Sequence, residues 1–131
     1  MSKNSFHNLD QLKVLNLEIN SIVEIEQDSF DSLRSSHQIS LNNNKIRRLP
    51  INLFKNCSSL NNIFLSKNLF KNPKDALDFG LDLKDDNVLD KISRIDLSYN
   101  LIDSFEGFTF KCPNVDILLL ENNKIKNITT N

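Results

Sequence analysis

The chain is poor in the residues on which catalysis and covalent cross-linking depend. Its 131 residues include two Cys, two His, two Gly, three Pro and no Trp. Two glycines cannot build a glycine-rich phosphate loop, and neither His7 nor His37 lies in a motif with a nucleophile or a second zinc ligand. We therefore expect a protein that is not an enzyme and that carries no cofactor and no metal.

An excess of one charge and long apolar runs are also missing. The formal net charge is −1, with 16 Lys and Arg against 17 Asp and Glu, so the sequence has no basic footprint for nucleic acid. No stretch reaches the roughly 20 apolar residues of a membrane span. Residues 1–10 lack the apolar run of a secretory signal. We expect no nucleic-acid partner and no membrane span in this chain.

What the chain does contain is an 11-residue pattern that recurs five times. In residues 92–102, ISRIDLSYNLI, aliphatic residues occupy the first, fourth, sixth and eleventh positions and Asn occupies the ninth. Residues 12–22, 60–70 and 115–125 fit the same template, and residues 36–46 fit it except for Ser36 at the first position. Five copies in near-constant register indicate a protein built from stacked repeats.

Each copy of the pattern predicts a short strand followed by a sharp turn. Side chains alternate along a strand, so the fourth and sixth positions enter the interior while the fifth faces outward. The ninth-position Asn offers a carbonyl and an amide, which satisfy buried backbone groups on its own coil and on its neighbour. We expect an internal ladder of five side chains: Asn20, Asn44, Asn68, Asn100 and Asn123.

The pattern, with Leu-Pro and Phe in the second half of a 24-residue period, resembles the leucine-rich repeat superfamily. Toll-like receptors and other extracellular leucine-rich repeat domains are the best-known relatives of this type. The resemblance implies an α/β solenoid: a right-handed horseshoe with a parallel sheet on its concave face and mostly irregular or short helical segments on its convex side. It does not fix the function, because the same solenoid serves receptors, adhesion proteins, enzyme inhibitors and scaffolds.

We expect residues 1–131 to form one domain of about five repeats. Its strands are predicted near residues 14–18, 38–42, 62–66, 94–98 and 117–121. Neither end shows a polar cap, so the chain is expected to be a fragment of a longer array. Phe108 and Phe110 compete for one inward position in the fourth coil, because the step from Asn100 to Asn123 is 23 residues.

One repeat is longer than the others. The ladder positions Asn44 and Asn68 are 24 residues apart, whereas Asn68 and Asn100 are 32 apart. This predicts an insertion at residues 74–87 on the convex side, with a helical turn over residues 74–78. Six acids lie in or beside it: Asp75, Asp78, Asp82, Asp85, Asp86 and Asp90. The alternate spacing and the Gly of a calcium loop are absent, so we expect no metal site.

The two cysteines occupy equivalent places in their repeats. Cys57 and Cys112 stand three residues before Leu60 and Val115, at a core position that Leu fills in the other repeats. They lie two coils apart, or roughly 10 Å, whereas a disulfide requires Cα atoms within about 7 Å. We expect two buried free thiols.

Most outward-facing strand positions are short and polar, and the exceptions are the candidates for partner binding. The predicted contact patch consists of Phe64, Arg94, Asp96, Tyr99 and Leu119. Exposed aromatic and Arg side chains are the types that carry binding energy at interfaces. Two alternatives stay open: a solvated face on which Arg94 pairs with Asp96 or a neighbour while Phe64 lies over adjacent side chains, and an apolar edge at residues 115–120 that pairs with another repeat or another copy.

The sequence therefore favours a non-catalytic recognition module that binds a protein or peptide on its concave face, as part of a receptor or adhesion ectodomain. The alternatives are a scaffold that self-associates through its open ends and an intracellular leucine-rich repeat regulator. An extracellular or cell-surface location is expected if the chain belongs to a longer protein, and a cytoplasmic one otherwise. Sequons at Asn56 and Asn127 do not discriminate, because chance explains two in a chain so rich in Asn, Ser and Thr.

Overall fold

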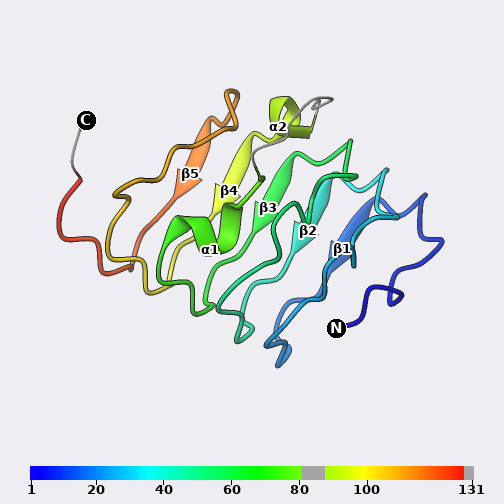
Figure 1. Cartoon of the computed structure of the whole chain (residues 1–131), viewed down its shortest axis with the longest axis horizontal. Coiled ribbons are helices and arrows are strands. Elements are labelled where there is room, and N and C mark those ends of the chain that lie inside the picture. The colour runs from blue at the N-terminus through cyan, green and yellow to red at the C-terminus, as the bar shows by residue number, and fades with distance from the viewer. Residues whose placement is uncertain (81–87, 129–131) are drawn as a thin grey trace.

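The computed structural model describes residues 1–80 and 88–128 of the chain, and these form a solenoid of stacked coils around one parallel sheet. The five strands are β1 (Val14–Asn16), β2 (Gln38–Ser40), β3 (Asn62–Phe64), β4 (Arg94–Asp96) and β5 (Ile117–Leu119). They lie side by side in sequence order, from β1 near the N-terminus to β5 near the C-terminus (Figure 1). The predicted α/β solenoid is confirmed, and each strand covers the first three residues of its expected range.

The strands are in register because every coil places the same template position at the same height. Leu15 pairs with Ile39, Ile39 with Ile63, Ile63 with Ile95, and Ile95 with Leu118. In the middle three strands these fourth-position side chains are fully buried, as are the sixth-position Leu residues that follow them. The alternation predicted from the sequence therefore builds a continuous aliphatic core.

Each strand is short because the backbone turns sharply directly after it. The eighth template position has a left-handed conformation in all five coils, with φ between 54° and 56°. The residues there are Ile19, Asn43, Lys67, Tyr99 and Asn122. Asn tolerates this conformation, whereas a β-branched residue such as Ile19 is strained in it.

The ladder Asn side chains bond adjacent coils to each other. The Nδ2 of Asn68 donates to the carbonyls of Leu41 in the preceding coil and of Leu65 in its own coil, at 2.9 and 3.3 Å. Its Oδ1 accepts from the backbone N–H of Ile46 in the preceding coil, at 3.1 Å. Equivalent bonds are made by Asn44, Asn100 and Asn123.

Asn20 differs because it belongs to the first coil. Its Nδ2 donates only to carbonyls of its own coil, those of Leu17 and Glu18, and its side chain is exposed. Each ladder Asn thus connects its coil to the one before it wherever such a coil exists.

Two short helices lie in the third repeat. α1 (Pro73–Leu77) follows Asn72, whose side-chain oxygen accepts from the backbone N–H of Asp75 and caps the helix. The helical turn expected over residues 74–78 is therefore present one residue earlier. The second helix, α2 (Val88–Lys91), was not expected from the sequence and buries Val88 and Leu89.

A column of Phe rings shows where the third repeat gains its extra length. The ring centroids of Phe6 and Phe30 are 6.0 Å apart, those of Phe30 and Phe54 also 6.0 Å, and those of Phe54 and Phe79 6.5 Å. Phe79 thus fills a regular coil position. It stands 11 residues after its ladder Asn, against 10 for Phe54, so most of the added length follows it. Residues 81–87 of the predicted insertion lie outside the described residues.

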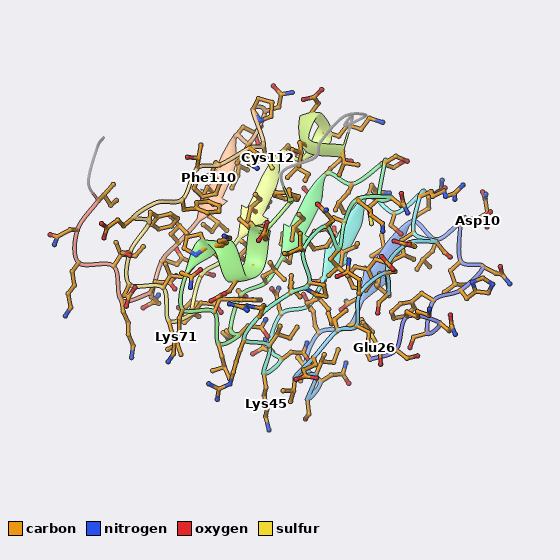
Figure 2. The ribbon with its side chains drawn as sticks, viewed as in Figure 1. Asp10, Glu26, Lys45, Lys71, Phe110 and Cys112 are labelled. Carbon is orange, nitrogen blue, oxygen red and sulfur yellow. The ribbon has the colours of Figure 1, made fainter. Side chains whose placement is uncertain are left out.

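The fourth coil has its own aromatic cluster in place of a single inward Phe. Phe105, Phe108 and Phe110 pack on one another with centroid separations of 4.9 to 6.3 Å, and all three are half-buried. Neither Phe108 nor Phe110 alone is the inward ring, because both stay half-buried and both pack against Phe105, which fills the place that Leu49 has in the second coil. Phe110 and Cys112 lie in the part of this coil that leads to β5 (Figure 2).

The two ends of the stack are covered to different degrees. At the first coil the N-terminal amino group donates to the carbonyl of Glu24, and the backbone N–H of Glu26 donates to the carbonyl of Met1. In β5, Leu118 is only partly buried, whereas the equivalent Ile95 is fully buried. Within residues 1–80 and 88–128, no helix is long and apolar enough to cross a membrane.

Candidate functional site

The outward-pointing residues of β1–β5 and of the turns that follow them form one surface, which we call the strand face. Phe64 aligns with Asp96 and Asp96 with Leu119 across neighbouring strands. Arg94 aligns with Asn62 and with Ile117 in the adjoining row. Because neighbouring strands are about 4.8 Å apart, the structure brings the predicted contact residues into one area.

Phe64 and Arg94 form a stacked pair on this surface. The guanidinium carbon of Arg94 lies 5.4 Å from the centroid of the Phe64 ring, within the range of a cation–π contact. Both side chains are only half exposed as a result. The Nε of Arg94 is buried and has no hydrogen-bond partner among the described residues. The pair therefore presents a flat, cationic surface with an unused donor beneath it.

Arg94 does not pair with Asp96, but Phe64 does lie against an adjacent side chain, as the solvated-face alternative expects. The Oδ1 of Asp96 accepts from the backbone N–H and from the hydroxyl of Ser98, at 3.0 and 2.6 Å. This turn fixes the carboxylate along its own strand and explains why Ser98 is buried. Asp96 keeps Oδ2 for a partner, and its charge is not neutralised by Arg94.

Tyr99 is the most exposed aromatic residue of the strand face, with 48% of its surface accessible. The ammonium of Lys67 lies 5.5 Å from the centre of its ring. Both residues occupy the left-handed eighth position, with φ of 54° each, which raises their side chains at the same edge of the face. A second cation–aromatic pair thus stands beside the first.

Leu119 and Ile117 lie at the last strand of the described sheet. Leu119 is half-buried, and Ile117 is 41% exposed. Their apolar side chains extend the patch from the Phe64–Arg94 pair toward the open side of β5.

The first two coils carry a polar cluster that the sequence did not single out. One carboxylate oxygen of Glu18 accepts from the hydroxyl of Ser40 at 2.5 Å and from the side-chain amide of Asn42 at 3.0 Å. The Oδ1 of Asn42 in turn accepts from the backbone N–H of Ser66 at 2.7 Å. Seventh-position Ser66 and Ser98 are therefore buried, although the template placed this row on the outward surface.

Lys67 is the main surface residue that sequence reasoning missed. It occupies the same template position as Tyr99 in the preceding coil, so the repeat register itself contained the signal. Residues at the same template position in successive coils are neighbours, and at the eighth position this places Lys67 beside Tyr99.

The chemistry of the two thiols argues against nucleophilic catalysis. Both cysteines are free and buried. Burial raises the pKa of Cys57 to about 12 and that of Cys112 to about 11. A thiolate is the reactive form, and it is negligibly populated at neutral pH at either position.

The acids of the third repeat serve local structure. Asp75 accepts from Arg48 and from the amide of Asn72, and Asp78 caps the backbone N–H of Gly80. Over residues 1–80 and 88–128, no group of three or more His, Cys, Asp or Glu side chains is placed to hold a metal ion. Asp82, Asp85 and Asp86 fall outside this part of the chain.

Five parallel strands in register, an Asn ladder that joins the coils and a column of buried Leu, Ile and Phe define a leucine-rich repeat protein. A family model described as the BspA type leucine rich repeat region matches residues 1–100 in six copies, and the chain belongs to this family. Domains of this family and fold typically serve protein interaction without catalysis.

Known proteins support the same assignment. Human epiphycan is 42% identical over 50 residues, which is 38% of this chain and 16% of epiphycan. The structure of TLR13 in complex with ssRNA13 superposes with a TM-score of 0.78 at 25% identity, over 92% of this chain and 16% of that one. A leucine-rich repeat protein of Leptospira interrogans gives a TM-score of 0.67 at 24% identity, over 92% of this chain and 28% of that one. An internalin of Listeria monocytogenes gives a TM-score of 0.66 at 19% identity, over 92% of this chain and 32% of that one.

The chain therefore spans less than a third of the length of each of these proteins.

Proposed function

We propose that this chain is a non-catalytic recognition module that binds a protein or peptide partner on its strand face, within an extracellular or cell-surface receptor or adhesion protein. The observation that carries the proposal is the pair of cation–aromatic contacts on neighbouring strands, Arg94 over Phe64 and Lys67 over Tyr99. Aromatic and Arg side chains of this kind supply most of the binding energy at protein interfaces.

The proposal rests on a division between the two sides of each strand. The interior side chains of β2–β4 are fully buried and hold the stack together. The outward side chains make few contacts with the core, and Tyr99 and Ile117 are exposed. Energy gained by covering them is therefore available to a partner, while their replacement leaves the core intact.

The chemistry of the face also favours a polypeptide partner over a nucleic acid. Both of its central cations already lie over aromatic rings, and the acids Glu18, Asp96 and Glu121 share the same surface. A polyanion is repelled by such a mixture, whereas a peptide offers donors for Asp96 and an apolar group for Leu119. The likeness to TLR13, whose structure contains RNA, makes single-stranded RNA the appropriate control ligand.

Similar proteins favour an extracellular or cell-surface location for this chain. The likeness to epiphycan, TLR13 and internalin supports an extracellular or cell-surface location as part of this proposal. The two buried free thiols are compatible with that setting, because a core thiol with a pKa near 12 is protected from oxidation by its burial.

The test uses a photo-crosslinking amino acid at position 99 to identify a partner, followed by binding measurements with the purified partner. We expect Tyr99→Ala and Phe64→Ala to raise Kd at least about tenfold, which corresponds to about 1.4 kcal/mol each. Thr109→Ala, on an exposed part of the return half of a coil, is the matched control and should leave Kd unchanged. Retained affinity in both strand-face variants, or equal loss in the control, contradicts the proposal.

The exposed β5 strand supports a second candidate function, self-association. Ile117 is 41% exposed and Leu118 is partly buried, although the equivalents of Leu118 in β2–β4 are fully buried. Among the described strands β5 pairs with β4 alone, and an apolar strand with an unpaired side pairs readily with another strand. Sedimentation at rising protein concentration tests this candidate. A chain that stays monomeric throughout is evidence against it, and Ile117→Lys should abolish any dimer that forms.

A further inference from the structure

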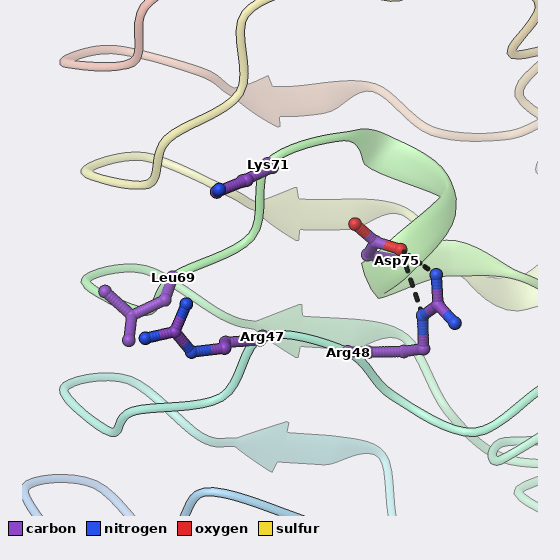
Figure 3. A pocket seen from close by; sticks show the side chains of 5 residues that line it. All are labelled: Arg47, Arg48, Leu69, Lys71 and Asp75. Carbon is purple, nitrogen blue, oxygen red and sulfur yellow. Dashed lines mark hydrogen bonds and ion pairs between the residues drawn. The ribbon is translucent and has the colours of Figure 1, made fainter.

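A basic pocket lies on the side of the solenoid where the chain leaves the Asn ladder, away from the strand face. It has a volume of about 260 Å³ and is lined by Arg47, Arg48, Leu69, Lys71 and Asp75. Arg47 and Lys71 extend to the same side of the pocket, and Arg48 extends toward Asp75 (Figure 3). Lys45 stands near this edge as well (Figure 2).

The single acid of the pocket is already engaged. The Oδ1 of Asp75 accepts from Nε and Nη2 of Arg48 at 3.1 and 3.0 Å, and its Oδ2 accepts from the side-chain amide of Asn72 at 2.8 Å. Within the described part of the chain, Arg47 and Lys71 have no ion-pair partner. The pocket therefore keeps two uncompensated positive charges.

The placement of these two charges is not explained by the fold. Arg47 and Lys71 both stand three residues after a ladder Asn, so they are neighbours on adjacent coils. The same row holds Val23, Asp103 and Lys126 in the other coils, so this is its one pair of adjacent like charges. Like charges on neighbouring coils repel each other. A bound anion would offset that cost.

We propose that this pocket binds a tetrahedral oxyanion, the sulfate or phosphate ester group of a larger ligand. Arg47 donates through the planar fork of its guanidinium, which matches two oxygens of such a group. Lys71 supplies a point charge from the next coil, and Leu69 covers the apolar side of the pocket. Asp75 holds the guanidinium of Arg48 at the rim of the pocket, turned away from Arg47 and Lys71 (Figure 3).

The side chain of Lys74 extends the positive charge beside the pocket. Lys74 lines an adjoining hollow that also contains Arg48 and Asp75. Four cations, Arg47, Arg48, Lys71 and Lys74, thus line these two adjoining hollows in a chain whose net charge is −1. Acids flank the cluster on both sides, with Glu24 and Glu26 in the first coil and Asp103 and Glu106 in the fourth. The site is consequently confined to one or two anionic groups.

The experiment titrates the chain with inorganic sulfate, inorganic phosphate and a heparin tetrasaccharide, with Arg Nε and Lys Nζ resonances as the readout. We expect saturable shifts at Arg47 and Lys71. Arg47→Ala and Lys71→Gln should each weaken binding about tenfold or more. Lys126→Ala, in the same row but two coils further along, is the matched control and should leave binding unchanged.

The outcomes separate the sources of the anion. Saturation by the tetrasaccharide but not by the inorganic ions supports an ester group on a larger ligand. Saturation by the inorganic ions alone, dependent on Arg47 and Lys71, supports the pocket with a free anion as its ligand. Equal loss of binding in the Lys126 control, or no saturable shift with any probe, overturns the proposal. The strand-face variant Tyr99→Ala should not alter these titrations, so this test is independent of partner binding.

Discussion

The middle coils and the end coils of this solenoid have the same sequence pattern but different surroundings. Ile63 of β3 and Leu118 of β5 occupy the same template position, yet Ile63 is fully buried and Leu118 only partly so. Asn68 bonds to the coil before it, whereas Asn20 bonds only within its own coil. The comparison teaches that the repeat sequence specifies a coil, while neighbouring coils supply its stability.

The largest expected difference concerns the aliphatic core. Ile63→Ala removes a fully buried side chain and should lower the free energy of unfolding by about 4 kcal/mol, because the closed stack cannot collapse around the cavity. Leu118→Ala should cost about 2 kcal/mol, since solvent already reaches part of that side chain. Urea denaturation of both variants measures the difference. Equal losses would mean that position in the stack does not matter.

The next difference concerns the Asn ladder. Asn68→Ala leaves the N–H of Ile46 and three carbonyls without their partner in a buried site, and we expect a loss of about 3 kcal/mol. Asn20→Ala should cost less than about 1 kcal/mol, because water replaces the amide at an exposed position. Thermal unfolding of the two variants checks this. A loss for Asn20→Ala as large as that for Asn68→Ala is the contrary result.

The thiols provide a smaller and chemically independent contrast. The pKa of Cys57 is about 12 and that of Cys112 about 11, in both cases because burial disfavours the thiolate. Both thiols should resist iodoacetamide at pH 8, and reactivity should rise as the pH approaches each pKa. Cys112 keeps a small exposed fraction whereas Cys57 has none, so we expect faster alkylation at Cys112. Mass spectrometry of the labelled protein measures both rates, and faster labelling of Cys57 would contradict the order.

The smallest effect concerns backbone strain in the first coil. Ile19 is β-branched and has φ of 55°, whereas Asn43 occupies the same place in the second coil with φ of 56°. Ile19→Asn should therefore raise the free energy of unfolding by about 1 kcal/mol, and the reverse change Asn43→Ile should lower it by a similar amount. Chemical denaturation measures the free energy of unfolding of both variants, and each variant serves as the control for the other. A loss of stability in Ile19→Asn would show that Ile19 has a packing role.

The interior of the fold was predictable from the sequence because a strict period determines it. The strand positions, the buried fourth and sixth residues and the separation of Cys57 from Cys112 all follow from the register of the repeats. The third repeat was not predictable in the same way, since an insertion breaks that register. Phe79 joins the aromatic column and α2 buries Val88 only because of contacts with neighbouring coils.

The strand face was predictable as a list of residues but not as an arrangement. The alternation of the strand identifies Phe64, Arg94 and Asp96 as outward-facing. It does not determine that Arg94 lies over Phe64 while Asp96 bonds to Ser98, because those contacts depend on side-chain rotamers across and along the strands. The Arg48–Asp75 pair was missed for a similar reason, since Asp75 lies in α1 of the irregular third repeat and not at the repeat position equivalent to Arg48.

Native-state hydrogen exchange tests the dependence of each coil on its neighbours most directly. The amides to follow are those of Ile22, Ile46, Phe70 and Ile102, each of which donates to a ladder Asn of the following coil. We predict that Ile46 and Phe70 exchange more slowly than Ile22 and Ile102, and that Asn68→Ala accelerates Ile46 the most. Uniform exchange of the four amides, with no selective response at Ile46 in the variant, would contradict the account.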